Sequence, residues 1–99
     1  FVPSDPVNGE RCFNTGYAVA EAYRGHGRAK ALVVAGSAEL KNGLSRNGIS
    51  KFHVEAIVGA DNAASKRVAA EAISSSPTEI TDSVSGEPAF HYITEVKSK

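Results

Sequence analysis

Two glycines, Gly25 and Gly27, constrain the fold of this chain more than any other feature of its sequence. They follow residues 11–20, which are rich in β-favouring side chains, and they precede a segment whose first turn is basic. Glycine has no Cβ, so the backbone can turn sharply and a ligand can approach it closely. The first amide N–H groups of a helix have no partner within the helix and carry partial positive charge. The sequence therefore predicts a strand, an anion-binding turn and a helix.

The spacing of the glycines argues against two common phosphate loops. A P-loop has four residues between its glycines and a Lys-Ser/Thr pair after the second, and this chain has neither feature. A dinucleotide-binding fingerprint has a third glycine where this chain has Lys30, and an acidic residue about 20 positions further on. That acidic residue is missing too, so a nucleotide-binding Rossmann fold is disfavoured.

The loop does follow another pattern, Arg/Gln-x-x-Gly-x-Gly/Ala, which Arg24, Gly27 and Ala29 satisfy. Residues 23–27 also read Tyr-Arg-Gly-x-Gly, and residues 62–65 read Asn-x-x-Ser. In this order, the motifs resemble the pyrophosphate loop and the next helix start of the GCN5-related N-acetyltransferases, the GNAT superfamily. The resemblance covers roughly residues 12 to 75 with motifs.

This resemblance implies that acetyl-CoA is the cofactor and that the loop holds its pyrophosphate. Asn62 is expected near the pantetheine arm, and the backbone of Val19 is expected to meet the cofactor where its strand splays from the next one. The residues implied to contact the cofactor are Val19, Arg24, Gly25, His26, Gly27, Arg28, Ala29, Asn62 and Ser65.

The resemblance also implies transfer of an acetyl group to an amine that attacks the thioester directly. The acceptor would be a small molecule, a protein N-terminus or a lysine. A base must take a proton from the acceptor ammonium, and Glu55 is our candidate, with His53 as the alternative. Many members use a tyrosine to protonate the departing thiolate, and that position is Ala69 here. The alternative function is therefore a shortened, inactive domain that acts by CoA binding or protein association.

Structural explanations remain open for each of these features. Gly25 and Gly27 also suit a simple connection from a strand to a helix. Asn62 and Ser65 suit a capping segment around Asp61, and Glu55 suits a solvated strand position.

The length of 99 residues predicts a single domain, and hydrophobic periodicity predicts an α/β (α+β) fold over residues 1–99. Residues 1–10, with an Asn-Gly turn signal, form either a strand leading into a turn or an irregular arm. A strand is expected at 11–20, with a bulge at Gly16. A helix is expected from 28 to about 44, with Gly36 packed on the sheet. A strand at 51–58, a helix from Asp61 to Ile73 and an antiparallel hairpin of 78–84 with 89–96 are expected after it. The expected sheet is mixed and partly parallel, in the order strand, helix, strand, helix, strand, strand. It corresponds to a GNAT-like acyl-CoA N-acyltransferase fold that lacks the family's N-terminal elements.

The composition of the chain limits the kinds of partner and ligand that we expect for it. Eleven basic and eleven acidic residues balance, so we expect no nucleic-acid surface. There is no apolar run of about 18 residues, so no membrane span is expected, and the single Cys12 cannot form an internal disulfide. A cytoplasmic protein is the simplest interpretation. The three histidines lack ligand spacing along the chain, so we expect no metal. The edge of the strand from Cys12 to Ala20 would be unpaired, which predicts a homodimer.

Overall fold

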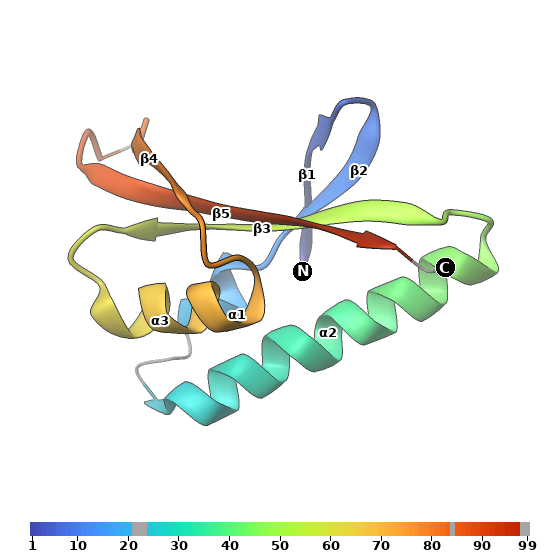
Figure 1. The fold of residues 1–99 in the computed structure, drawn as a ribbon, viewed down its shortest axis with the longest axis horizontal. Helices are drawn as coiled ribbons and strands as arrows, with labels where there is room; N and C mark the ends of the chain where they lie inside the picture. The colour runs from blue at the N-terminus through green and yellow to red at the C-terminus, as the bar shows by residue number, and fades with distance from the viewer. Residues whose placement is uncertain (21–23, 84, 98–99) are drawn as a thin grey trace.

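A mixed five-stranded sheet forms the body of the molecule, and its helices all cover one face (Figure 1). The computed structural model describes residues 1–20, 24–83 and 85–97. The strand order is β1-β2-β3-β5-β4. In chain order the elements are β1 (Val2–Val7), β2 (Glu10–Asn14), α1 (Gly16–Ala20), α2 (His26–Arg46), β3 (Lys51–Gly59), α3 (Ala63–Ala72), β4 (Thr78–Thr81) and β5 (Pro88–Lys97).

Strand β3 lies at the centre of the sheet and confirms the alternation expected from the sequence. Its residues Phe52, Val54, Ala56 and Val58 are all buried. Ala56 and Val58 pack in one core cluster with side chains of all three helices. Strand β2 runs parallel to β3, and β5 runs antiparallel to both β3 and β4. The parallel crossover and the C-terminal hairpin were therefore predicted correctly.

The expected strand at residues 11–20 is correct only as far as Asn14. Pairing with β3 covers Cys12 to Asn14, and the chain then turns into the short helix α1. The Asn14 side-chain oxygen accepts the Gly16 N–H at 2.8 Å, and the Thr15 carbonyl accepts the Val19 N–H at 3.1 Å. These local bonds satisfy the backbone in place of a sheet ladder, so the predicted bulge at Gly16 and the splayed strand beyond it are wrong.

The opening residues form β1, which pairs with β2 in an antiparallel hairpin. Asn8 and Gly9 make the turn, with φ values of 52° and 80°, as the Asn-Gly signal predicts. Prolines 3 and 6 are tolerated because β1 is an edge strand. Since β1 covers the edge of β2, the unpaired edge from which we inferred a homodimer does not exist.

Helix α2 extends over 21 residues and buries Ala29 and Val33. It begins two residues earlier and ends about two residues later than the sequence predicts, and the packing of Gly36 also differs from the prediction. A Cβ on Gly36 would lie 2.5 Å from the Phe1 ring, so this glycine makes room for the N-terminal residue rather than for the sheet. Among the described residues, no helix is long and apolar enough to cross a membrane.

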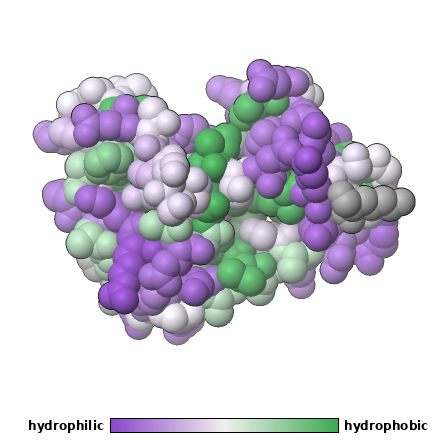
Figure 2. Space-filling model, viewed as in Figure 1, coloured by the Kyte–Doolittle hydropathy of each residue, from purple (hydrophilic) through white to green (hydrophobic). Residues whose placement is uncertain are grey.

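Helix α3 begins one residue later than expected. Its N-cap is Asn62 and not Asp61, because the Asn62 side-chain oxygen accepts the Ser65 N–H at 3.1 Å. The buried side of α3 is formed by Ser65, Val68 and Ala69. In Figure 2 the two hairpins form separate lobes, and apolar surface is exposed between them.

Candidate functional site

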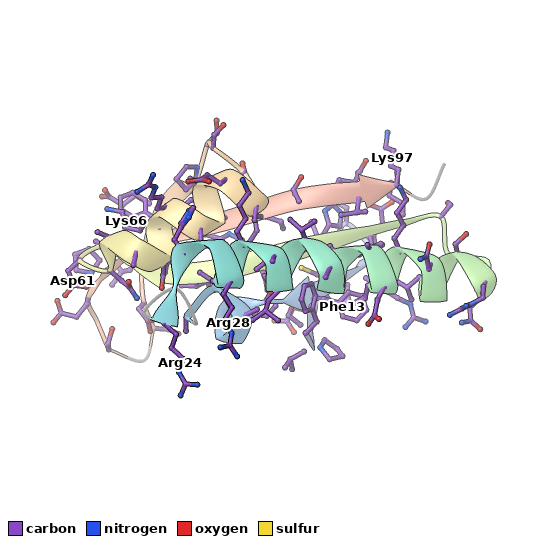
Figure 3. All side chains as sticks on the ribbon, turned by 90° about the horizontal axis from the view of Figure 1, so that it is seen from below. Phe13, Arg24, Arg28, Asp61, Lys66 and Lys97 are labelled. Carbon is purple, nitrogen blue, oxygen red and sulfur yellow. The ribbon has the colours of Figure 1, made fainter. Side chains whose placement is uncertain are left out.

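The start of α2 presents the backbone that the sequence predicts for an anion site. Gly25 is the N-cap residue, with φ 152°, and has no side chain that could cap the helix. The first helical bond runs from the Ala29 N–H to the Gly25 carbonyl at 3.1 Å, so the amide groups of residues 26–28 precede the helical ladder. A Cβ on Gly27 would have no neighbour within 4 Å. Arg24 and Arg28 project to the same side of this turn (Figure 3).

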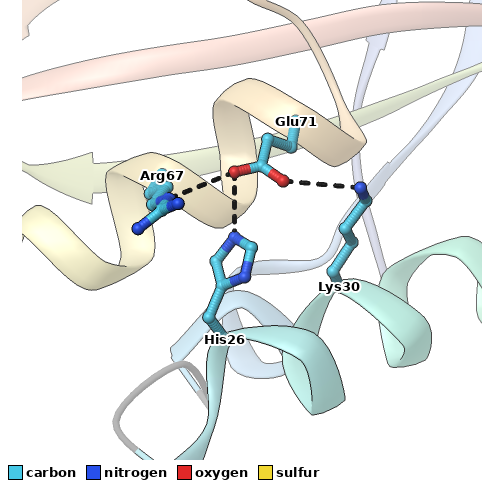
Figure 4. Close-up of polar contacts among 4 residues, drawn as sticks. All are labelled: His26, Lys30, Arg67 and Glu71. Atoms are coloured by element: carbon cyan, nitrogen blue, oxygen red, sulfur yellow. Dashed lines mark hydrogen bonds and ion pairs between the residues drawn. The ribbon is translucent and has the colours of Figure 1, made fainter.

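Part of the positive charge near this turn is already matched by Glu71 on α3 (Figure 4). Its carboxylate lies 3.0 Å from His26 Nε2, 3.4 Å from Lys30 Nζ and 3.3 Å from Arg67 Nε. Burial alone would raise the pKa of Glu71, but the contacts with Lys30 and His26 outweigh it and lower that pKa. Sequence reasoning missed Glu71, because only its spacing from Arg67 is visible along the chain.

The second motif joins α3 to α1. Asn62 caps α3, and the Ser65 hydroxyl donates to the Val19 carbonyl at 3.3 Å. Val19 and Ser65 are buried, and the Val19 N–H is bonded to Thr15. Both polar groups of the Val19 backbone are therefore used within the chain. Asn62 and Ser65 act here as the capping segment that was the structural alternative.

One buried polar atom near this motif lacks a partner. The Thr15 side chain is 1% exposed, and no described residue makes a hydrogen bond with its hydroxyl. Thr15 stands between the last residue of β2 and the start of α1. An unsatisfied hydroxyl at this position is costly unless a ligand or a water bonds to it.

Glu55 lies on the sheet face opposite the helices, as its alternation with the buried Ala56 requires. Its Oε1 is 2.6 Å from His91 Nε2 on β5. Burial raises the pKa of the neighbouring Cys12 thiol, and the charge of Glu55 adds to this effect. Cys12 therefore stays protonated at neutral pH, which disfavours a role as nucleophile. The histidine partner of Glu55 was missed, because it depends on strand register.

The structure thus separates the predicted site residues into two groups. Loop 24–29 and the motif at 62–65 belong to the helical layer, where Glu71 links α3 to the first turn of α2. The Glu55 side chain lies on the other face of the sheet.

A surface cavity of about 400 Å³ lies at the end of the sheet where the β3–α3 and β4–β5 connections meet. Its lining includes Asp61, Asp82 and Glu87. Three carboxylates repel a pyrophosphate, so this cavity does not suit the phosphate end of a cofactor. Comparison with known proteins gives no match to a family model, a curated protein or a solved structure.

Proposed function

We propose that this chain binds the pyrophosphate of acetyl-CoA at the start of α2 and is an acetyl-CoA-dependent N-acetyltransferase of the GNAT type. The observation that carries the proposal is the geometry of loop 24–29. Gly25 opens the helix without a side-chain cap, Gly27 leaves the approach open, and the first amide groups precede the helical ladder. A diphosphate suits such a turn, with Arg24 and Arg28 adding charge.

The order of the elements supports the same proposal. Apart from the short helix α1 after β2, the chain runs from β2 to the helix of the first motif, β3, the helix of the second motif and the β4–β5 hairpin, which is the order of the C-terminal half of the family.

Catalysis in this proposal comes mainly from positioning. Acetyl-CoA would supply the thioester, and the fixed loop would hold its phosphates so that an acceptor amine meets the carbonyl carbon. Glu55, the base expected from the sequence, bonds to His91 on the sheet face opposite loop 24–29, so its carboxylate does not lie beside a thioester whose phosphates that loop holds. The acceptor would be a small-molecule amine, a protein N-terminus or a lysine.

A second candidate function is a domain that binds CoA or a protein partner without catalysis. Many members of the family have a tyrosine that acts as a general acid, and the corresponding position here is Ala69, which is fully buried in the core. No proton donor for the leaving thiolate can come from this position. In this alternative, the domain still binds the cofactor at loop 24–29 but catalyses no acetyl transfer.

Calorimetric titration with acetyl-CoA tests the proposed site. In Gly27→Glu a carboxylate beside the loop should repel the pyrophosphate and weaken binding at least about tenfold. The matched control is Gly43→Glu on the same helix, where a Cβ also has no neighbour within 4 Å. We expect micromolar binding by the unmodified chain and the control. No binding by the unmodified chain, or equal binding by all three proteins, would refute the site.

Acetylation assays then separate the two functions. With acetyl-CoA saturating, release of free CoA thiol in the presence of a panel of amines supports the transferase. Cofactor binding without release of the CoA thiol, whichever amine is added, supports the non-catalytic domain.

A further inference from the structure

The open face of the sheet carries a cluster that the proposed cofactor site does not use, although one of its members, His53, was the alternative base in the sequence analysis. Glu10 on β2, His53 on β3 and Glu95 on β5 bring one ligand atom each to a common point, with all three atoms within 4.8 Å of one another. We propose that this cluster, which we call the three-strand cluster, is a binding site for a divalent transition metal of the Zn²⁺ class.

Strand register fixes the three positions. His53 is paired directly with Glu95 across β3 and β5, and with Cys12 across β2 and β3. Glu10 lies two residues before Cys12 and so points to the same face. The ligands therefore come from three neighbouring strands of one sheet, which is a rigid frame. Spacing along the chain could not reveal this set, because it depends on strand register.

The geometry is close to that of a metal centre. His53 is 8% exposed, and its Nε2 lies 2.9 Å from Glu10 Oε1. Donor atoms around a tetrahedral zinc ion are about 3.3 Å apart, given bonds of about 2.0 to 2.1 Å. Small shifts of two carboxylates are enough to reach this arrangement, because both lie on the open face. Glu95 is the more exposed of the two acids, with 36% of its side chain exposed against 27% for Glu10.

Lysines support the carboxylates from outside. Lys51 Nζ binds Glu10 Oε2 at 2.9 Å, which leaves Oε1 facing His53. Lys97 Nζ lies 3.5 Å from Glu95 Oε1. The contact with Lys51 would orient the Glu10 carboxylate for a metal. The longer, exposed contact between Lys97 and Glu95 is weak, so a bound dication would displace it.

The chemical types of the three donor atoms indicate which metal ion would bind. One imidazole nitrogen and two carboxylate oxygens suit Zn²⁺ or Co²⁺. Mg²⁺ and Ca²⁺ prefer sites made of oxygen alone. Three protein ligands also leave a coordination position for water.

Zinc titration of the chelator-stripped protein tests the proposal. We expect one Zn²⁺ per chain, no comparable binding of Mg²⁺, and an increase in melting temperature of roughly 10 °C or more at a hundredfold excess over the dissociation constant. Glu95→Gln should weaken zinc binding at least about tenfold, since even losing an outer partner costs 10 to 100-fold. Glu39→Gln, at an exposed position of α2, is the charge-matched control and should bind zinc as the unmodified chain does.

Histidine ring NMR gives an independent readout, because the chain has only three histidines. Zinc should shift the His53 ring signals first and leave those of His26 and His91 in place. Circular dichroism of metal-free Glu95→Gln verifies that the variant is folded. Zinc binding that is equal in Glu95→Gln and Glu39→Gln, that shifts another histidine, or that is absent from the unmodified chain would overturn the assignment.

Discussion

At the scale of single residues, Glu71 decides how much positive charge the start of α2 presents. Its carboxylate contacts His26 and Lys30, which both belong to the first turns of that helix. In the proposed complex, a pyrophosphate at the loop would compete with this carboxylate for contact with Lys30 and His26. Glu71 would then hold α3 against α2 and at the same time lower the affinity for the anion.

Replacing Glu71 should strengthen cofactor binding. Glu71→Gln removes the competing charge, so we expect acetyl-CoA affinity to rise a few-fold, in line with the modest energy of exposed ion pairs. The gain should shrink at high salt, because screening weakens these interactions. Calorimetry at two salt concentrations measures it, with Glu39→Gln as control. Unchanged or weaker binding would show that His26 and Lys30 take no part.

The same residue should give an acid-dependent contribution to stability. The pKa of Glu71 is lower in the folded chain than its ordinary value of 4.5. Its stabilising contribution is therefore complete above about pH 4.5 and is lost as the pH falls through the folded pKa. Denaturant unfolding between pH 7 and pH 3 should show a shallower loss in Glu71→Gln than in the unmodified chain. Parallel curves for the two proteins would contradict this.

At the scale of secondary-structure elements, the sequence predicts what depends on a long, regular pattern. Strand β3 was found because its apolar side chains alternate, and helix α2 was found because its apolar residues recur at helical spacing, although only Ala29 and Val33 of this helix are buried. Helix α1 was missed, because it has only five residues and its Tyr17 and Val19 alternate as in a strand. The bonds that hold it come from Asn14 and from Ser65, which is 46 residues away from Val19. The contacts of Glu71 and His91 were missed for the same reason: they join segments distant in sequence.

The cap of α3 offers a direct test of one boundary. Asn62→Ala removes the side chain that accepts the Ser65 N–H, so it should lower the free energy of unfolding by about 1 kcal/mol. Asp61→Ala, the residue that the sequence favoured as the cap, should have the smaller effect. Denaturant unfolding of both variants measures the difference. A larger loss in Asp61→Ala would assign the cap to Asp61 after all.

At the scale of the whole molecule, the sheet divides the chain into two faces with different chemistry. The helical face carries loop 24–29 and its cations, and the open face carries the three-strand cluster and the Glu55–His91 pair. The two proposed sites share no side chain. A ligand on one face can influence the other only by shifting the strands between them.

We therefore expect acetyl-CoA and zinc to bind independently. Coupling between two sites requires a conformational equilibrium that both ligands shift, and none of the contacts given above among the described residues links the two faces in this way. Each ligand should raise the free energy of unfolding, by about 2.7 kcal/mol at a hundredfold excess over its dissociation constant, and the two increments should add. Thermal unfolding with either ligand and with both measures them. A sum that deviates by more than about 0.5 kcal/mol would show that strands β2 and β3 transmit binding from one face to the other.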